Sequence, residues 1–498
     1  MKKLSKLLAL MLAVIMTLSV MPVSFAAEVE KCPTIYIPGI ASSKIYSDVN
    51  DSSSLFEFPS IEVLTKRVEN EVVPALIVYA ADKDADKLAG VISDLFNYIF
   101  EGWFNNPDGS AKGNSGAILR YPSAASINEN SIITFDWDWR GDPVEVAEKL
   151  NVFINYVTVN SKFNKVALAS HSLGSTVILS YLSKYGSDKI TGIVYDTPVI
   201  DGVNYVGELL LGNMETDGDA IVATVKSLLG SSENADVINN LMDILTLAGL
   251  TGEFAGLFNS VIDEIAPVLY RDTLVPLFAR WVTVWAMTPA EDVDTAADYI
   301  FTKYLTDEES QVLKSKVERY NNLVRENRYE TLRNFDANGR FAVISRYGYS
   351  SLPITQKWSE ASDNVVETSR SSLGATTAVV GDFFSDEYIA SKNAKYISPD
   401  KTIDASTCFV PEKTWFIKGL DHAKTTVTRS YYSALLFGAE EATCDNFVLS
   451  RFTAYDAESE SIVADESVPV KTEKKTAFQV LIDFIRNFFK KLLSFFGK

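Results

Sequence analysis

Short apolar runs alternate with longer amphipathic segments along much of the chain, and this alternation predicts a buried β-sheet with helices packed on it. Helical spacing of the apolar positions covers residues 86–100, 144–157 and 173–185. Strands and helices that alternate in this way are typical of right-handed βαβ units. The predicted fold class is therefore α/β with a mainly parallel central sheet. The expected strands are 34–37, 131–135, 165–169, 190–195, 340–345 and 413–418.

The alternation stops between residues 201 and 335, where the pattern is helical and several apolar groups recur. We interpret this stretch as a helical lid inserted over the carboxyl edge of the sheet. The insertion divides the core of the domain into a first part, 27–200, and a second part, 336–454. Polar and charged residues at 455–473 predict a linker, because such a composition buries too little apolar surface to fold.

The N-terminus has the pattern of a secretion signal. Lysines at positions 2, 3 and 6 precede an apolar stretch at 7–21, and Ser24-Phe25-Ala26 is similar to a cleavage site. A permanent membrane anchor is the alternative, but the apolar stretch is short for a bilayer span. We therefore expect residues 1–26 to be a signal peptide and the mature protein to be secreted or associated with the cell surface.

Charge and cysteine content narrow the range of functions. The chain has 65 acidic and 46 basic residues and a formal net charge of −19, so it repels phosphate backbones and we expect no nucleic-acid partner. Three cysteines are too few for a disulfide framework. Secretion allows one bridge, for which Cys408 and Cys444 are the favoured pair; three thiols without a bridge are the alternative. None of the three has the spacing of metal ligands.

The sequence Ser-His-Ser-Leu-Gly at residues 170–174 lies between a predicted strand and a predicted helix. This is the context of a nucleophile elbow, in which a serine on a tight strand-to-helix turn needs small residues on both sides. Ser170 and Gly174 are those small residues. The turn also places Ser172 at a helix N-terminus, where free N–H groups stabilise developing negative charge. Ser172 is therefore the candidate nucleophile.

A serine nucleophile needs a general base, and the chain has two histidines. His171 adjoins the nucleophile and points away from it, so we expect it to pack beside the elbow. His422 follows the last predicted strand and is the base by elimination. The acid of the triad should lie between nucleophile and base in the chain. Asp400, in a turn before the final strand, is favoured, and Asp404 and Asp196 are the alternatives.

Taken together, these motifs resemble α/β-hydrolase lipases, and most of all the lecithin–cholesterol acyltransferase-like branch. The resemblance rests on Pro-Gly-Ile-x-x-Ser at 38–43, on Asp-Trp-Arg at 138–140 and on the elbow at 170–174. It implies an α/β-hydrolase fold, and an oxyanion hole formed by the backbone N–H groups of Ile40 and Leu173.

The same family has an Asp-Gly-Thr-Val-type acid loop and an Asp-His loop. Asp400-Lys401-Thr402-Ile403 and Asp421-His422 match these loops, with Lys401 in place of the glycine. The resemblance leaves open whether water or an alcohol accepts the acyl group.

The last segment, 474–498, has the pattern of an amphipathic helix, with six basic residues and one acidic residue. A basic amphipathic helix after a polar linker fits an anionic membrane surface, which we expect as a partner. A helix packed on the core of its own domain is the alternative.

The sequence as a whole predicts a serine esterase or lipase whose substrate is an ester or lipid. A Ser-His-Asp triad would act through an acyl-enzyme, and this chemistry requires no metal or organic cofactor. An acyltransferase with the same triad is the first alternative. A catalytically inactive surface-binding protein on a hydrolase fold is the second.

Overall fold

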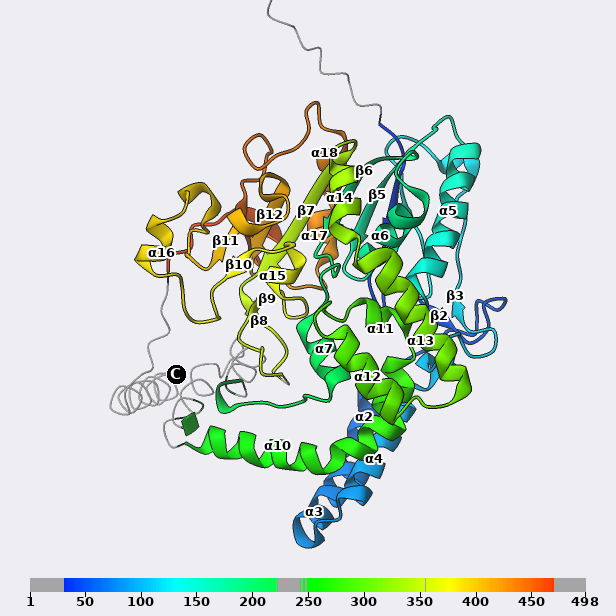
Figure 1. Cartoon of the computed structure of the whole chain (residues 1–498), viewed down its shortest axis with the longest axis vertical. Coiled ribbons are helices and arrows are strands. Elements are labelled where there is room, and N and C mark those ends of the chain that lie inside the picture. The colour runs from blue at the N-terminus through cyan, green and yellow to red at the C-terminus, as the bar shows by residue number, and fades with distance from the viewer. Residues whose placement is uncertain are drawn as a thin grey trace, which may run out of the picture.

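A computed structural model describes residues 31–469 apart from 221, 223–241, 243, 244, 247, 248 and 354. The expected signal peptide and the expected amphipathic tail lie outside the described residues. An eight-stranded sheet crosses the molecule in the order β14-β13-β12-β7-β6-β5-β1-β4 (Figure 1). Its neighbouring strands run parallel, except for the antiparallel pair of β13 and β14.

Six strands of this sheet are those expected from the sequence. They are β1 (Thr34–Ile37), β4 (Ile132–Thr134), β5 (Val166–His171), β6 (Ile190–Asp196), β7 (Arg340–Tyr347) and β12 (Thr414–Lys418). The fold class and the mainly parallel sheet are therefore confirmed. The remaining two strands are β13 (Phe452–Asp456) and β14 (Ser461–Ala464). Short two-residue pairs lie outside this sheet: β2 (Ile45–Tyr46) with β3 (Gly116–Ala117), β8 (Tyr349–Ser350) with β9 (Ala361–Ser362), and β10 (Thr376–Thr377) with β11 (Ile403–Asp404).

Side chains of the central strands alternate between two apolar layers, because successive residues of a strand point to opposite faces. Ile35 and Ile37 of β1 enter the larger cluster together with α5 (Pro143–Val159) and α6 (Gly174–Tyr185). Tyr36 enters the second cluster, which includes Leu435 and Leu436 of α18 (Tyr432–Phe437). Burial on both faces explains why these strands read as continuous apolar runs.

The helices are as follows. The first part of the core contains α2 (Ile61–Arg67), α3 (Val73–Asp82), α4 (Ala85–Ile99), α5 and α6. The range 201–335 contains α7 (Asn204–Leu211), α10 (Leu250–Leu269), α11 (Val282–Ala286), α12 (Val293–Lys303), α13 (Glu308–Tyr320) and α14 (Arg328–Asp336). The second part of the core contains α15 (Thr368–Ser371), α16 (Asp386–Ala390), α17 (Thr425–Arg429) and α18.

The helical character expected for 201–335 is thus present in its described parts, but these helices do not pack alone. Helices α3 and α4 pack against α10 around a small separate core of Tyr79, Leu88, Ile265 and Leu269. Figure 1 shows these helices projecting together from the end of the molecule away from the sheet. None of the described helices has the length and apolarity needed to cross a lipid bilayer.

The linker and the favoured disulfide differ from the structure. The chain from 455 to 464 is not a linker, because β13 and β14 form an antiparallel pair there and Tyr455 and Ile462 pack on the second apolar cluster. Cys408 and Cys444 form no disulfide, and both are free thiols. The thiol of Cys444 instead donates a hydrogen bond to the carbonyl oxygen of Thr414 at 3.2 Å.

Candidate active site

Ser172 lies on a strained turn that connects β5 directly to α6. Its φ is +52°, in the left-handed region that residues other than glycine rarely adopt. The N–H of Ser172 donates to the carbonyl oxygen of Asp196 at 3.0 Å, which fixes the turn to the end of β6. A side chain at Gly174 would come within 2.2 Å of the carbonyl oxygen of Ile37, so only glycine fits there. This local geometry is that of a nucleophile elbow.

The loop after β1 lies against the elbow. A side chain at Gly39 would come within 2.9 Å of the Cβ atom of Ser172, so the two backbones approach closely. Ile40 directly follows Gly39 in this loop, and Leu173 directly follows the serine. Their role as oxyanion donors stays a prediction.

Two tryptophans hold this loop in place. The indole N–H of Trp137 donates to the carbonyl oxygen of Pro38 at 2.9 Å, and that of Trp139 donates to the carbonyl oxygen of Ser43 at 3.0 Å. The hydroxyl of Ser43 also donates to Asp136 at 3.3 Å. These contacts join the loop at 38–43 to the segment 136–139.

His422 lies in the loop after β12, beside the elbow. Its ring centroid is 4.5 Å from that of His171, the residue that precedes the serine. Nδ1 of His422 contacts Oδ2 of Asp363 at 2.7 Å, and Nε2 has no hydrogen-bond partner in the part of the chain that the structure describes. An imidazole that donates from Nδ1 to a carboxylate keeps Nε2 available to accept a proton.

The carboxylate that orients His422 is that of Asp363, which the sequence reasoning missed. Asp363 is fully buried, and its Oδ1 accepts from the backbone N–H groups of Val365 at 3.1 Å and Val366 at 2.7 Å. Burial alone raises the pKa of this carboxyl group. The neighbouring His422 and the N–H of Val366 more than offset burial and hold the pKa of Asp363 below its usual range.

None of the three expected acids contacts His422, and the choice of Asp400 is wrong. Asp400 pairs with Lys418 at 2.6 Å, while Asp404 accepts from the hydroxyl of Tyr388 at 2.8 Å. Asp196 is fully buried and pairs with Arg346 at 2.9 Å. Each of these carboxylates is occupied by a partner away from the imidazole.

A signal for the true position is present in the sequence. Asp363-Asn364-Val365-Val366 follows the same Asp-x-x-apolar pattern as the expected acid loop. Asn364 has a φ of +79°, and asparagine tolerates this left-handed conformation better than most residues other than glycine. Asparagine is thus a better substitute for the glycine of that pattern than the lysine at position 401.

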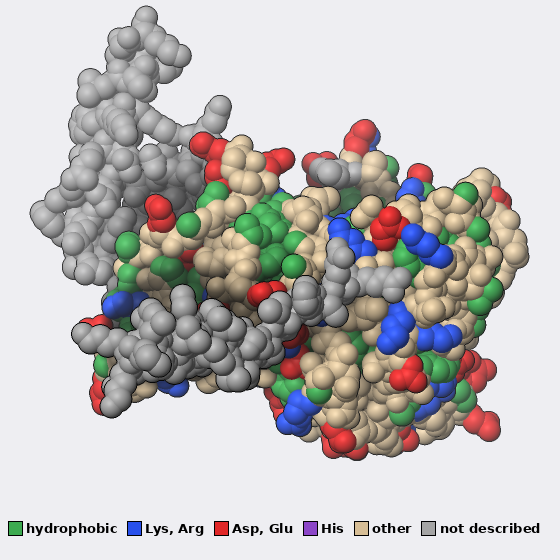
Figure 2. Space-filling view, turned by 90° about the horizontal axis from the view of Figure 1, so that it is seen from above, with side chains coloured by type: hydrophobic (Ala, Val, Ile, Leu, Met, Phe, Trp, Pro, Cys, Tyr) green, Lys and Arg blue, Asp and Glu red, His purple; other side chains and the backbone are tan. Residues whose placement is uncertain are grey.

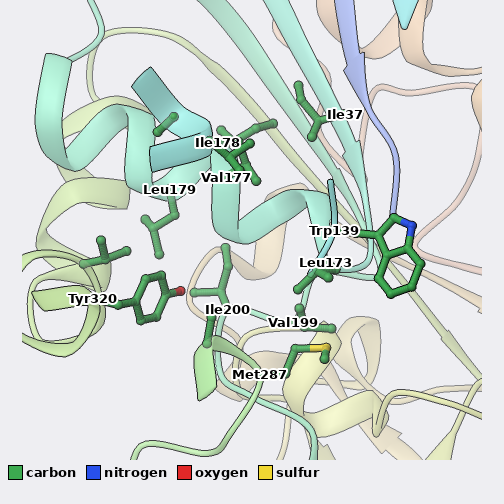
Figure 3. Close-up of a cluster of buried hydrophobic side chains, with 14 of the residues drawn as sticks. Ile37, Trp139, Leu173, Val177, Ile178, Leu179, Val199, Ile200, Met287 and Tyr320 are labelled. Atoms are coloured by element: carbon green, nitrogen blue, oxygen red, sulfur yellow. The ribbon is translucent and has the colours of Figure 1, made fainter. Parts of the chain in front are cut away.

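The site is closed in this structure. Ser172 is 3% exposed and His422 is 8% exposed. Figure 3 shows Leu173 next to Trp139 and Val199, with Met287 of the inserted region beyond them. The N–H of Val203 donates to the carbonyl oxygen of Met287 at 2.7 Å, which ties the chain after β6 to the segment after α11.

The strand order, the elbow after β5 and the histidine loop after β12 together decide the fold. The chain has an α/β-hydrolase fold. A model of the lecithin:cholesterol acyltransferase family matches residues 122–238, which include the elbow. The expected resemblance to this branch of the hydrolases is therefore confirmed over about a quarter of the chain, and it supports an ester-cleaving or acyl-transferring hydrolase.

Solved structures show weaker similarity. The Tle4–Tli4 complex is 10% identical, with 63% of this chain and 75% of that chain covered and a TM-score of 0.25. A bromoperoxidase from Bacillus anthracis is 12% identical, with 66% and 77% covered and a TM-score of 0.18. MGS-M2, an α/β hydrolase from a Medee basin deep-sea metagenome library, is 9% identical, with 62% and 89% covered and a TM-score of 0.17. Among curated proteins, none matches this sequence.

Proposed function

We propose that this α/β hydrolase cleaves carboxylic esters through an acyl-enzyme on Ser172. The observation that carries the proposal is the strained serine at the elbow with the Asp363–His422 pair beside it. Ser172 Oγ attacks the acyl carbonyl while Nε2 of His422 takes its proton and then passes it to the departing alcohol. Water, activated by the same imidazole, releases the acid. The proposed steps use no metal or organic cofactor.

In this mechanism, negative charge develops on the carbonyl oxygen of the substrate. The N–H groups of Ile40 and Leu173 would stabilise it, and Leu173 directly precedes α6, whose N-terminal dipole favours the same charge. The N–H of Ser172 itself is already bonded to Asp196. Asp363 stays ionised and holds the proton of His422 on Nδ1.

Lipid esters are the proposed substrates. The family model supports this class, and the projecting helices carry exposed apolar side chains, Ile77 on α3 and Phe254 and Leu257 on α10, which are 66%, 57% and 58% exposed. Exposed apolar side chains of this size on neighbouring helices favour contact with a lipid phase. On the face seen in Figure 2, by contrast, acidic and basic side chains are scattered without one large patch of either sign.

Acyl transfer to an alcohol is the second candidate, because the matching family model is that of an acyltransferase. Both reactions share the acyl-enzyme and differ in the group that attacks it. The two reactions can be distinguished by analysing the products of assays run with and without a long-chain alcohol. A transferase gives mainly the new ester, and a hydrolase gives mainly the free acid.

Residues 474–498 are proposed to tether the secreted enzyme to an anionic lipid surface, on the strength of their six basic residues and apolar positions. A chain ending at Glu473 should lose binding to phosphatidylserine-containing vesicles and keep its turnover of a soluble short-chain ester. Unchanged vesicle binding would overturn the tether. A large fall in melting temperature would indicate a helix packed on its own domain.

A chain-length series of chromogenic esters tests the proposed function. We expect turnover by the natural protein that rises with acyl length, and none above background for Ser172→Ala. A natural protein without turnover of any ester, yet correctly folded, would favour the inactive surface-binding protein instead.

A further inference from the structure

The backbone of His422 is held by two side chains that have no part in the proposed chemistry. Nη1 of Arg346 donates to the carbonyl oxygens of Asp421 at 2.7 Å and of His422 at 3.0 Å. Nε2 of His171 contacts the same oxygen of His422 at 3.0 Å. Since a carbonyl oxygen only accepts, this nitrogen of His171 carries a proton and donates it. Donors from β7 and β5 thus converge on one main-chain oxygen.

The loop that carries His422 needs such contacts. Residues 419–424, between β12 and α17, form neither helix nor strand. The N–H of His422 donates to the carbonyl oxygen of Asp363 at 3.0 Å, so both backbone groups of the histidine are paired outside its own loop. Loops without regular structure vary in conformation unless they are held by their surroundings.

Arg346 is itself fixed by a buried network. Its Nη2 donates to both carboxylate oxygens of Asp196 at 2.9 Å, and the two side chains are fully buried. The hydroxyls of Thr428 and Tyr432 donate to the same carboxylate at 2.5 Å and 2.9 Å. A buried ion pair adds little stability over apolar side chains of equal volume. What this pair supplies is a rigid guanidinium aimed at two carbonyl groups.

The same network reaches the nucleophile. The carbonyl oxygen of Asp196 accepts from the N–H of Ser172 at 3.0 Å, while its carboxylate holds Arg346. His171 makes a second and shorter connection, because it directly precedes Ser172. We infer that Arg346 and His171 are positioning residues that set the place of His422 relative to Ser172. This inference rests on the proposed function, in which His422 acts as the base.

His171 can play this part without disturbing the charge of the site. Burial is the main reason why the pKa of His171 lies well below its ordinary value, and positive charge on His422 and Arg346 lowers this pKa further. The ring of His171 is therefore neutral near neutral pH. Its Nδ1 has no hydrogen-bond partner among the described residues. A neutral ring with its proton on Nε2 holds the backbone of the base and leaves the base's own ring free.

Kinetics of paired variants test the inference. His171→Leu removes the donor, whereas the side-chain amide of His171→Gln can still donate. On a soluble ester, we expect His171→Leu to lower kcat about a hundredfold and to change KM less than about threefold. The kcat of His171→Gln should be at least about tenfold higher than that of His171→Leu. Equal impairment of the Leu and Gln variants, or kcat near that of the natural protein for Leu, would overturn the inference.

The Arg346 arm of the network needs a double variant, because a single one leaves the buried negative charge of Asp196 without its positive partner. Arg346→Met with Asp196→Asn should lower kcat about a hundredfold at nearly constant KM. Arg451→Met is the matched control, since Arg451 is also buried and bonded to a main-chain carbonyl and a carboxylate, but lies away from His422. It should lower the melting temperature and leave kcat within about threefold.

Two histidines in the chain make a direct spectroscopic readout possible. In protein labelled with ¹⁵N-histidine, we expect one signal from a ring protonated on Nε2, that of His171, and one from a ring protonated on Nδ1, that of His422. The first signal should be absent from His171→Gln. The Nδ1 proton should lose its strong downfield shift in the Arg346→Met, Asp196→Asn protein. An unchanged Nδ1 signal together with unchanged kcat would overturn the positioning role. Failure of the proposed function would look different, as a natural protein that turns over no ester.

Discussion

Replacing Asp363 by asparagine should reverse the tautomer of His422 while keeping the shape of the site. Oδ1 of Asp363 accepts from two backbone N–H groups, those of Val365 and Val366, whereas Oδ2 faces Nδ1 of His422 at 2.7 Å. An asparagine keeps its oxygen toward the two backbone donors, so its NH₂ group turns toward His422. That group donates to Nδ1 and moves the imidazole proton to Nε2, which can no longer accept a proton from the serine.

The expected loss is large because the correct tautomer becomes a minor species. Tautomer reversal in a serine triad costs about ten-thousandfold in kcat, or about 5.5 kcal/mol in activation free energy. The assay is turnover of a soluble short-chain ester at saturating concentration, with folding checked by circular dichroism. Binding of substrate involves other groups, so KM should change little.

Asp400→Asn is the matched control. Asp400 bonds to Lys418 at 2.6 Å and to the hydroxyls of Ser398 at 2.6 Å and Thr402 at 2.8 Å, and it makes no contact with His422. Its loss should cost about 1–2 kcal/mol of stability and leave kcat within about threefold. If Asp400→Asn lost far more activity than Asp363→Asn, the assignment of the acid would be refuted.

Other variants probe the nucleophile, the elbow and the buried histidine. Ser172→Ala and His422→Ala should each leave the same low residual turnover, measured on the same ester, because the two residues act as a unit. Gly174→Ala should lower both the melting temperature and kcat, because its Cβ would overlap the carbonyl oxygen of Ile37. Because the pKa of His171 is lowered in the folded protein, the unfolded chain takes up a proton on this residue at a higher pH than the folded chain does. Below about pH 6.5 the free energy of unfolding should therefore fall by up to about 1.4 kcal/mol per pH unit. Urea unfolding of His171→Gln should show a smaller loss over that range, and an identical pH dependence would contradict the reasoning.

Most of the central sheet could be predicted from the sequence for a simple physical reason. Strands buried on both faces, such as β5 and β6, contain short runs of apolar residues that stand out from their surroundings. The elbow could be predicted as well, because its chemistry depends on neighbours in the chain. The strands β13 and β14 were not expected, since this edge pair is short and β14 exposes half of its residues.

The acid could not be fixed by sequence reasoning because its contact is made by the tertiary fold. Asp363 stands 59 residues from His422 and lies in a region where no periodicity predicts an element. Turn chemistry alone does not decide, since Asn364 and Lys401 both have positive φ after an aspartate. Asparagine at 364 favours Asp363 over Asp400, but the position of each turn in space decides between them.

The central claim is that Ser172 is a nucleophile activated by His422, and a fluorophosphonate probe tests it most directly. Such probes bond to a serine hydroxyl only where a base activates it. After reaction of the whole chain, mass spectrometry should find one adduct, on the peptide that contains Ser172, and almost none in His422→Ala. A folded protein that takes up no probe, or an adduct on another serine that persists in Ser172→Ala, would contradict the account.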